Sequence, residues 1–304
     1  MPIPDFQSFM LPVLQLAGDG AEHSLEEART VLAERFSLTE AERAELLPSG
    51  RQRRFDNRVA WAKVYLQQAG VLSSRRRAHF EITERGRHLL SEGLERIDIA
   101  RLKEFDEFRE FQSAGRRPDA GIVVQAPIAA AIETPEEMLE QAFQSIRAEV
   151  VSDLLAHVKS SSPSFFENIV VELLLKMGYG RNRAEAGRAI GGVGDEGIDG
   201  IISEDRLGLD TIYIQAKRWD GNVGRPEIQK FVGALQGKRA RKGVFITTGS
   251  FSSEAKDYVS RIDPRVVLID GRQLAEYMLD LNLGVSTKIL YEIKRIDTDY
   301  FVEE

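Results

Sequence analysis

A stretch of small residues in the middle of the chain separates two parts that have regular hydrophobic patterns. Residues 113–133 read SAGRRPDAGIVVQAPIAAAIE, contain two prolines, and show neither helical nor strand periodicity. The preceding residues 97–112 are charged and compatible with a helix. The sequence therefore predicts two domains, residues 1–95 and 134–304, joined by a linker over residues 96–133.

Composition agrees with two packed domains, since 42% of the 304 residues are apolar and 29% are charged. The absence of cysteine excludes disulfides, thiolate metal sites and cysteine nucleophiles. The four histidines do not have the spacing of a zinc site. No run approaches the roughly 18 apolar residues of a membrane helix, and the N-terminus lacks a signal-peptide pattern. We therefore expect a cytoplasmic protein without membrane contact.

The first part reads as helices, a short hairpin and a further helix. The predicted helices cover residues 3–17, 24–36, 39–47, 56–69 and 83–91. Between the last two, residues 71–72 and 79–82 read as strands on either side of a basic turn. This order is that of a winged helix-turn-helix domain.

Positive charge is concentrated on the predicted hairpin and the helix before it. The whole chain has a net charge of −7, yet residues 51–87 hold ten Lys or Arg against three acids. Such a patch is the expected footprint of DNA binding, because arginine and lysine contact phosphates. The alternatives are a solvated basic face and a winged helix that binds protein. The predicted DNA-binding residues are Arg51, Arg53, Arg54, Arg58, Arg75, Arg76 and Arg77.

The second part predicts an α/β domain. Thr134, Pro135 and Glu137 form a capping-box signature that begins a helix ending near residue 159. Further helices are predicted over residues 163–177, 226–236, 252–262 and 271–282, and strands over 197–203, 211–219, 243–248 and 266–270. The first two strands are expected to form a hairpin. The later strand–helix units predict a mixed sheet flanked by helices.

Glu167 is unusual within the predicted helix 163–177. At 100° per residue it lies about 140° from Glu172, on the face expected to be buried. A buried carboxylate needs a cation, a metal or hydrogen-bond donors. A structural salt bridge and a functional role explain this position equally well.

A glycine-rich loop precedes the first predicted strand, over residues 191–200 (GGVGDEGIDG). Its glycines match GxGxxG, but a dinucleotide site needs that motif between a strand and a helix. Here the loop leads into a strand, and its acids would repel a phosphate. No nucleotide cofactor is therefore predicted, and the loop's main feature is Asp199 at the start of the strand.

The strand 211–219 places Gln215 and Lys217 on one face, because side chains alternate along a strand. A lone lysine near a strand end is usually a surface residue. Beside an acid on the neighbouring hairpin strand, Lys217 becomes a candidate for phosphate chemistry.

Together these residues resemble the PD-(D/E)xK nuclease superfamily, and more closely the Mrr-type restriction endonucleases. The resemblance rests on Phe166-Glu167, Gly178-Tyr179, GGVGDEGIDG, YIQAKRW and GVFITTGSFS. Glutamine in place of the second acid is that family's usual variant. A winged-helix domain at the N-terminus is also the family's usual arrangement. The implied fold is a restriction-endonuclease-like sheet joined to a winged-helix domain.

The resemblance implies Asp199, Gln215, Lys217 and Glu167 as catalytic residues. It implies Asp199, Gln215 and the carbonyl of Ala216 as ligands of Mg²⁺ or Mn²⁺, with Glu167 acting through the metal's water shell. Lys217 would position the attacking water. Since glutamine removes one negative charge, one bound metal is favoured over two.

The implied function is a restriction endonuclease that cleaves methylated foreign DNA by Mg²⁺-dependent phosphodiester hydrolysis. The alternatives are a non-catalytic DNA-binding regulator and a repair or junction nuclease with the same fold. Its partner would be double-stranded DNA, and it would associate with the nucleoid when bound. Because a duplex break requires two strand cuts, a homodimer or larger homo-oligomer is expected.

Overall fold

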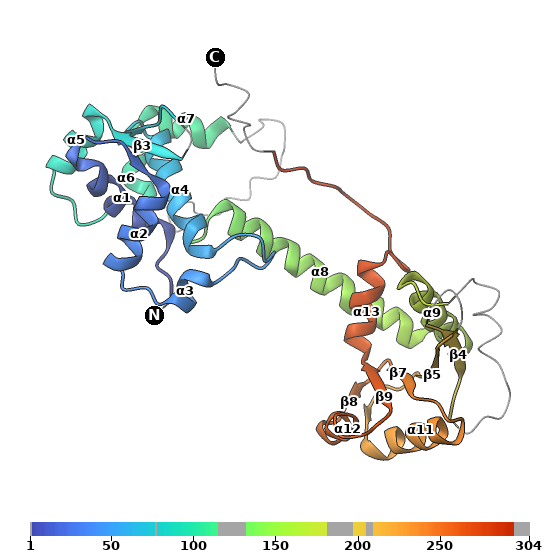
Figure 1. The fold of residues 1–304 in the computed structure, drawn as a ribbon. Coiled ribbons are helices and arrows are strands. Elements are labelled where there is room, and N and C mark those ends of the chain that lie inside the picture. Colours follow the sequence, from blue (N-terminus) through green and yellow to red (C-terminus); the bar gives the residue numbers. More distant parts are fainter. Residues whose placement is uncertain (1, 77, 115–131, 181–196, 205–208, 295–304) are drawn as a thin grey trace. The chain divides into compact units, whose positions relative to one another are not determined.

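The computed structural model describes residues 2–76, 78–114, 132–180, 197–204 and 209–294 (Figure 1). Two compact units divide between Gln144 and Ser145. This point lies inside the long helix α8 (Pro135–Ser160), so the helix begins in the first unit and ends in the second. Over the described ranges, no helix is long and apolar enough to cross a membrane.

The first unit combines helices with a small antiparallel sheet. Its helices include α1 (Met10–Leu16), α2 (Leu25–Arg35), α3 (Glu40–Ala44), α4 (Arg54–Gln68), α5 (Glu84–Ser91), α6 (Ile99–Leu102) and α7 (Asp106–Ala114), with the 3-10 helices η1 (Phe6–Phe9) and η2 (Ala17–Asp19). Strands β1 (His23–Ser24), β2 (Leu72–Ser73) and β3 (His79–Ile82) pair in the order β1-β3-β2. The order of helices, hairpin and helix agrees with the winged-helix prediction.

Local sequence signals explain where these helices begin and how the last one packs. The hydroxyls of Ser24 and Thr83 accept the third backbone N–H of α2 and α5, as N-caps do. At Gly86, in α5, an added Cβ would lie 2.3 Å from the carbonyl oxygen of Val71. Glycine therefore lets α5 lie directly against the hairpin.

Two predictions for this part differ from the structure. The helix expected from residue 3 begins at Met10, because Asp5 caps the separate 3-10 helix η1. The linker expected over residues 96–133 is wrong in its first part, since Ile99, Leu102 and Phe108 are fully buried in the first core. The many charged residues around these positions make the apolar side of α6 and α7 difficult to recognise from the sequence. Residues 115–131 lie outside the described part of the chain.

The second unit contains a four-stranded mixed sheet. Its strands are β4 (Gly200–Ser203), β5 (Thr211–Lys217), β7 (Lys242–Thr247) and β9 (Arg265–Ile269), in the order β4-β5-β7-β9. β4 and β5 are antiparallel, as the hairpin prediction requires, and β5, β7 and β9 are parallel. The short strands β6 (Asn222–Val223) and β8 (Ser250–Phe251) form a separate parallel pair.

Helices cover both faces of this sheet (Figure 1). They include α9 (Pro163–Lys176), α11 (Arg225–Gly237), α12 (Ser253–Val259) and α13 (Gly271–Asp280). Ile214 and Ile246 pack with α9, α13 and the end of α8, whereas Phe245 packs with α11 and α12. The mixed α/β sheet flanked by helices is confirmed, and its strand alternation directs Gln215 and Lys217 toward the α11 side.

Candidate functional site

Asp199 lies where β4 meets β5, directly before the first residue of β4. Its backbone N–H donates to the carbonyl of Ile214 at 2.9 Å, which holds it against the neighbouring strand. Its Oδ2 accepts from Nε2 of Gln215 and from the backbone N–H of Ala216, both at 2.7 Å. The structure thus brings together the three residues that the sequence proposes as metal ligands.

Gln215 and Glu167 complete the surroundings of this carboxylate. Gln215 is buried, with 5% of its surface exposed. Glu167, on α9, is half-buried. Burial raises the pKa of Glu167, and the negative charge of Asp199 raises it further. The negative charge of Asp199 therefore acts on Glu167, which lies on the helix packed against β5.

Within the described part of the chain, Lys217 makes no hydrogen bond to Asp199. Its Nζ donates instead to Glu227 in the first turn of α11. The same ammonium lies 4.6 Å from the ring centre of Trp219. The hydrogen bond from Lys217, and to a lesser extent the one from Lys230, lowers the pKa of Glu227. Sequence reasoning missed Glu227, because its position after Pro226 indicates only an acid in the first turn of a helix and not a contact with Lys217.

The donor set around Asp199 suits a hard divalent cation. No group of three or more His, Cys, Asp or Glu side chains in the described ranges could hold a metal by itself. Asp199 and Gln215 instead offer one carboxylate and one amide, and Ala216 offers a backbone carbonyl. Oxygen donors of this kind, completed by waters, fit Mg²⁺. Gly192, Gly194, Asp195 and Glu196 of the preceding loop lie outside the described residues.

The predicted DNA-binding arginines fall into two groups. Arg51 and Arg53 are exposed before α4, and Arg75 and Arg76 are exposed on the hairpin turn. Arg75 pairs with Glu81 at 2.9 Å and Arg76 with Glu22 at 2.7 Å, with 82% and 65% of the arginine side chains exposed. Exposed ion pairs of this kind are weak and can exchange for phosphates. Arg77 lies outside the described residues.

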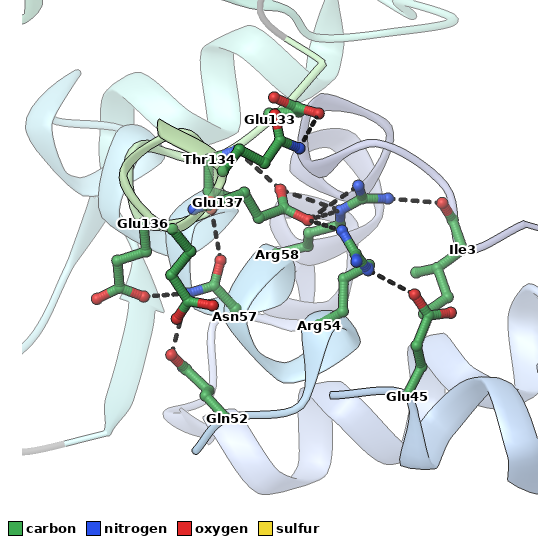
Figure 2. Close-up of polar contacts among 12 residues, drawn as sticks. Ile3, Glu45, Gln52, Arg54, Asn57, Arg58, Glu133, Thr134, Glu136 and Glu137 are labelled. Atoms are coloured by element: carbon green, nitrogen blue, oxygen red, sulfur yellow. Dashed lines mark hydrogen bonds and ion pairs between the residues drawn. The ribbon is translucent and has the colours of Figure 1, made fainter. Parts of the chain in front are cut away.

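Arg54 and Arg58 form the second group, and both point to an acid at the start of α8 (Figure 2). Glu137 is 1% exposed and accepts from Arg54 Nη1 at 2.9 Å and from Arg58 Nε at 3.0 Å. Arg58 is itself buried and also donates to the carbonyls of Ile3 and Pro4. Its guanidinium is thus committed inside the protein, so we replace its predicted DNA contact with a structural role.

Neighbouring residues extend the junction between α4 and α8 (Figure 2). Thr134 donates its hydroxyl to Asn57 at 2.6 Å, and the amide of Asn57 donates to Glu136. Asn57, Thr134 and Glu137 are all buried. The first turn of α8 is therefore built into the first unit by a set of buried polar contacts.

Comparison with known proteins gives a match within each of the two units. Residues 6–92 match the family model described as Mrr N-terminal domain, and residues 158–278 match the model described as restriction endonuclease. The type IV methyl-directed restriction enzyme EcoKMrr of Escherichia coli strain K12 is 34% identical over 314 residues, covering 99% of this chain and 100% of that protein. The chain belongs to the Mrr family of restriction endonucleases.

Two solved structures are similar to parts of this Mrr-family chain. The DNA modification-dependent restriction endonuclease AspBHI is 17% identical, with a TM-score of 0.37, over 45% of this chain and 36% of that one. The MspJI restriction endonuclease in complex with a 27-mer oligonucleotide is 22% identical, with a TM-score of 0.29, over 59% of this chain and 41% of that one.

The candidate residues fall within the matched ranges of the Mrr family models, with one exception. Glu167, Asp199 and Lys217 lie in the restriction-endonuclease range, and so does Glu227. The exposed arginines lie in the Mrr N-terminal range. Glu137, which pairs with Arg58, lies between the two ranges.

Proposed function

We propose that this Mrr-family enzyme is a Mg²⁺-dependent endonuclease that hydrolyses phosphodiester bonds of methylated foreign DNA. The observation that carries the proposal is the convergence of Gln215 and Ala216 on Oδ2 of Asp199. It gathers the carboxylate of Asp199, the side-chain amide of Gln215 and the backbone of Ala216 near the end of β5, where Lys217 is the next residue.

The roles of these side chains follow from their chemistry. A bound Mg²⁺ or Mn²⁺ would neutralise charge on the phosphate and lower the pKa of a bound water. Asp199 would be its principal ligand, with the Ala216 carbonyl and the amide oxygen of Gln215. Because the Gln215 amide supplies no negative charge, a single metal is favoured. Glu167 would orient water around it.

Lys217 would hold the attacking water and stabilise negative charge at phosphorus, as cationic donors do in phosphoryl transfer. The exposed Arg51, Arg53, Arg75 and Arg76 would bind the duplex backbone. We further propose a homodimer, because two strands must be cut, and action in the cytoplasm at the nucleoid. The methylated substrate is supported by the methyl-directed relative EcoKMrr.

The test uses supercoiled plasmid in methylated and unmethylated forms, incubated with the protein and Mg²⁺ or with EDTA. Lys217→Ala is compared with Lys256→Ala, which changes an exposed lysine on α12. We expect cleavage of the methylated plasmid alone, lost with EDTA and with Lys217→Ala but kept with Lys256→Ala. Equal cleavage of both plasmids would overturn the proposal that the enzyme requires methylated DNA. Binding without any cleavage would favour a DNA-binding regulator.

A further inference from the structure

Glu227 carries a carboxylate beside the proposed catalytic Lys217. None of the proposed catalytic or metal-binding roles involves this carboxylate. Its Oε2 accepts from Nζ of Lys217, and its Oε1 accepts from Nζ of Lys230 at 2.8 Å. The side chains of Lys217 and Glu227 are 26% and 19% exposed, whereas that of Lys230 is 73% exposed. The pair of Lys217 and Glu227 is therefore more enclosed than an ordinary surface ion pair.

Both ends of this pair are attached to rigid elements. Lys217 is the last residue of β5 and lies in register with Thr247 of β7. Glu227 follows the N-cap Gly224 by three residues, and the next residue, Ile228, is fully buried in the second unit. Since neither backbone position can shift freely, the carboxylate occupies a defined place relative to the end of β5.

The ammonium of Lys217 is fixed from two sides. Glu227 accepts its hydrogen bond, and the ring of Trp219 lies 4.6 Å away, within the range of a cation–π contact. A lysine has a flexible four-carbon stem, and without such contacts its charge samples many positions. Catalysis depends on holding the reacting groups in one geometry, so this restriction bears on rate.

The pair also adjoins the proposed metal ligands. The residue before Lys217 is Ala216, whose backbone N–H donates to Asp199 at 2.7 Å. Lys217 therefore directly follows Ala216, one of the proposed metal ligands, and its ammonium is held at this end of β5. Lys230 bonds the second carboxylate oxygen, which offsets the negative charge that Glu227 would otherwise present to a phosphate.

We propose that Glu227 is a positioning residue for Lys217: its carboxylate holds the lysine ammonium at the end of β5, where the scissile phosphate of the substrate binds. The kinetic part of this inference rests on the proposed nuclease function. A purely structural ion pair would hold the lysine and contribute to the stability of the domain without affecting the rate of cleavage.

The first experiment reads the position of Lys217 without using activity. In protein with ¹⁵N-labelled lysine, nuclear magnetic relaxation gives an order parameter for each Nζ, and Lys217→Arg assigns the Lys217 signal. We expect Lys217 to be restricted in the wild type and clearly more mobile in Glu227→Gln, although less mobile than the exposed Lys256, because the contact with Trp219 remains. Glu276→Gln, which removes an exposed partner of Arg272 on α13, should leave Lys217 unchanged. Equal order in the wild type and Glu227→Gln would overturn the proposal.

The second experiment separates chemistry from binding on the full chain. Single-turnover cleavage at saturating DNA should fall about 100-fold in Glu227→Gln, the size of effect seen when a catalytic group is misplaced. DNA affinity and thermal stability should stay near wild type, and Glu227→Asp should restore part of the rate. A wild-type rate in Glu227→Gln, or a loss matched by lost affinity, would overturn the proposal. If Asp199→Asn also cleaved normally, the nuclease site itself would be wrong, and the order parameter of Lys217 would still decide whether Glu227 positions it.

Discussion

The Nε of Arg58 donates to the carboxylate of Glu137 at 3.0 Å and joins α4 to the first turn of α8 across 79 residues of sequence. The two side chains are 9% and 1% exposed, so both charges are removed from water and satisfied by each other. The start of α8, which lies outside both matched family ranges, is therefore an integral part of the first unit.

Breaking this buried pair should destabilise the first unit. Glu137→Gln keeps the shape of the side chain but leaves the buried guanidinium of Arg58 without its counter-charge, at a cost of about 3 kcal/mol, whereas Arg54 keeps its pair with Glu45. The chain has two tryptophans, and Trp61 lies on α4, so its fluorescence in a Trp219→Phe background reports unfolding of this unit in urea.

Glu140→Gln is the matched control for that measurement. Glu140 lies one turn further along α8 and accepts hydrogen bonds from the exposed Ser49. Its substitution should change the unfolding free energy by no more than about 0.5 kcal/mol. Equal losses in the two variants would contradict a specific role for the buried carboxylate of Glu137.

The same glutamate shows how far sequence reasoning reaches. The capping-box pattern correctly predicts that α8 begins after Thr134, and the N–H of Thr134 does donate to Glu137 at 2.9 Å. A local pattern involves residues three apart, however, and it contains no information about Arg58 in a distant helix. For this reason the charge count assigned Arg58 to DNA, whereas tertiary packing commits it to the interior.

The candidate active site shows the same division between local and tertiary information. Strand alternation correctly places Gln215 and Lys217 on one face of β5, and the hairpin brings Asp199 beside Gln215. Glu227 escaped notice because its contact with Lys217 depends on how α11 packs across β7, which no spacing along the chain specifies.

The exposed hairpin arginines should dominate electrostatic binding to DNA. Each phosphate contact adds about 0.9 to the slope of log affinity against log salt concentration. We expect the double variant Arg75→Ala, Arg76→Ala to reduce that slope by about 2, with weaker binding to every DNA sequence. Fluorescence anisotropy over a salt series measures it. Arg96→Ala removes an arginine that pairs with Asp5 and should preserve the slope. An unchanged slope in the double variant would argue against DNA contact by the hairpin turn.

His23 should make the stability of the first unit depend on pH. Its Nε2 lies 2.9 Å from Asp19 and its Nδ1 lies 3.1 Å from Glu27. Burial disfavours the charged imidazole, but hydrogen bonds with the two carboxylates outweigh it and raise the pKa of His23 above the ordinary value. Because the folded state binds this proton more tightly, the contribution is fully present below about pH 6.5 and is lost as pH rises through the folded pKa.

Urea unfolding followed by Trp61 fluorescence at about pH 6 and pH 8 tests this linkage. The wild type should lose more stability than His23→Gln over that interval. His88→Gln changes an exposed histidine of the same unit and should behave like the wild type. A pH dependence that survives in His23→Gln would assign the effect to another group.

Gln215→Glu should couple the stability of the second unit to metal. The amide of Gln215 now donates to Asp199 at 2.7 Å, and a glutamate there would place two carboxylates in contact. Without metal the like charges repel and lower the melting temperature by several degrees. Mg²⁺ would bind the added charge more tightly and so raise the melting temperature more than in the wild type, by mass action. Thermal unfolding with Mg²⁺ and with EDTA measures both effects. Asp280→Asn, which alters a carboxylate paired with Arg147, should show neither. If Mg²⁺ stabilised Gln215→Glu no more than the wild type, Gln215 would not lie at a metal site.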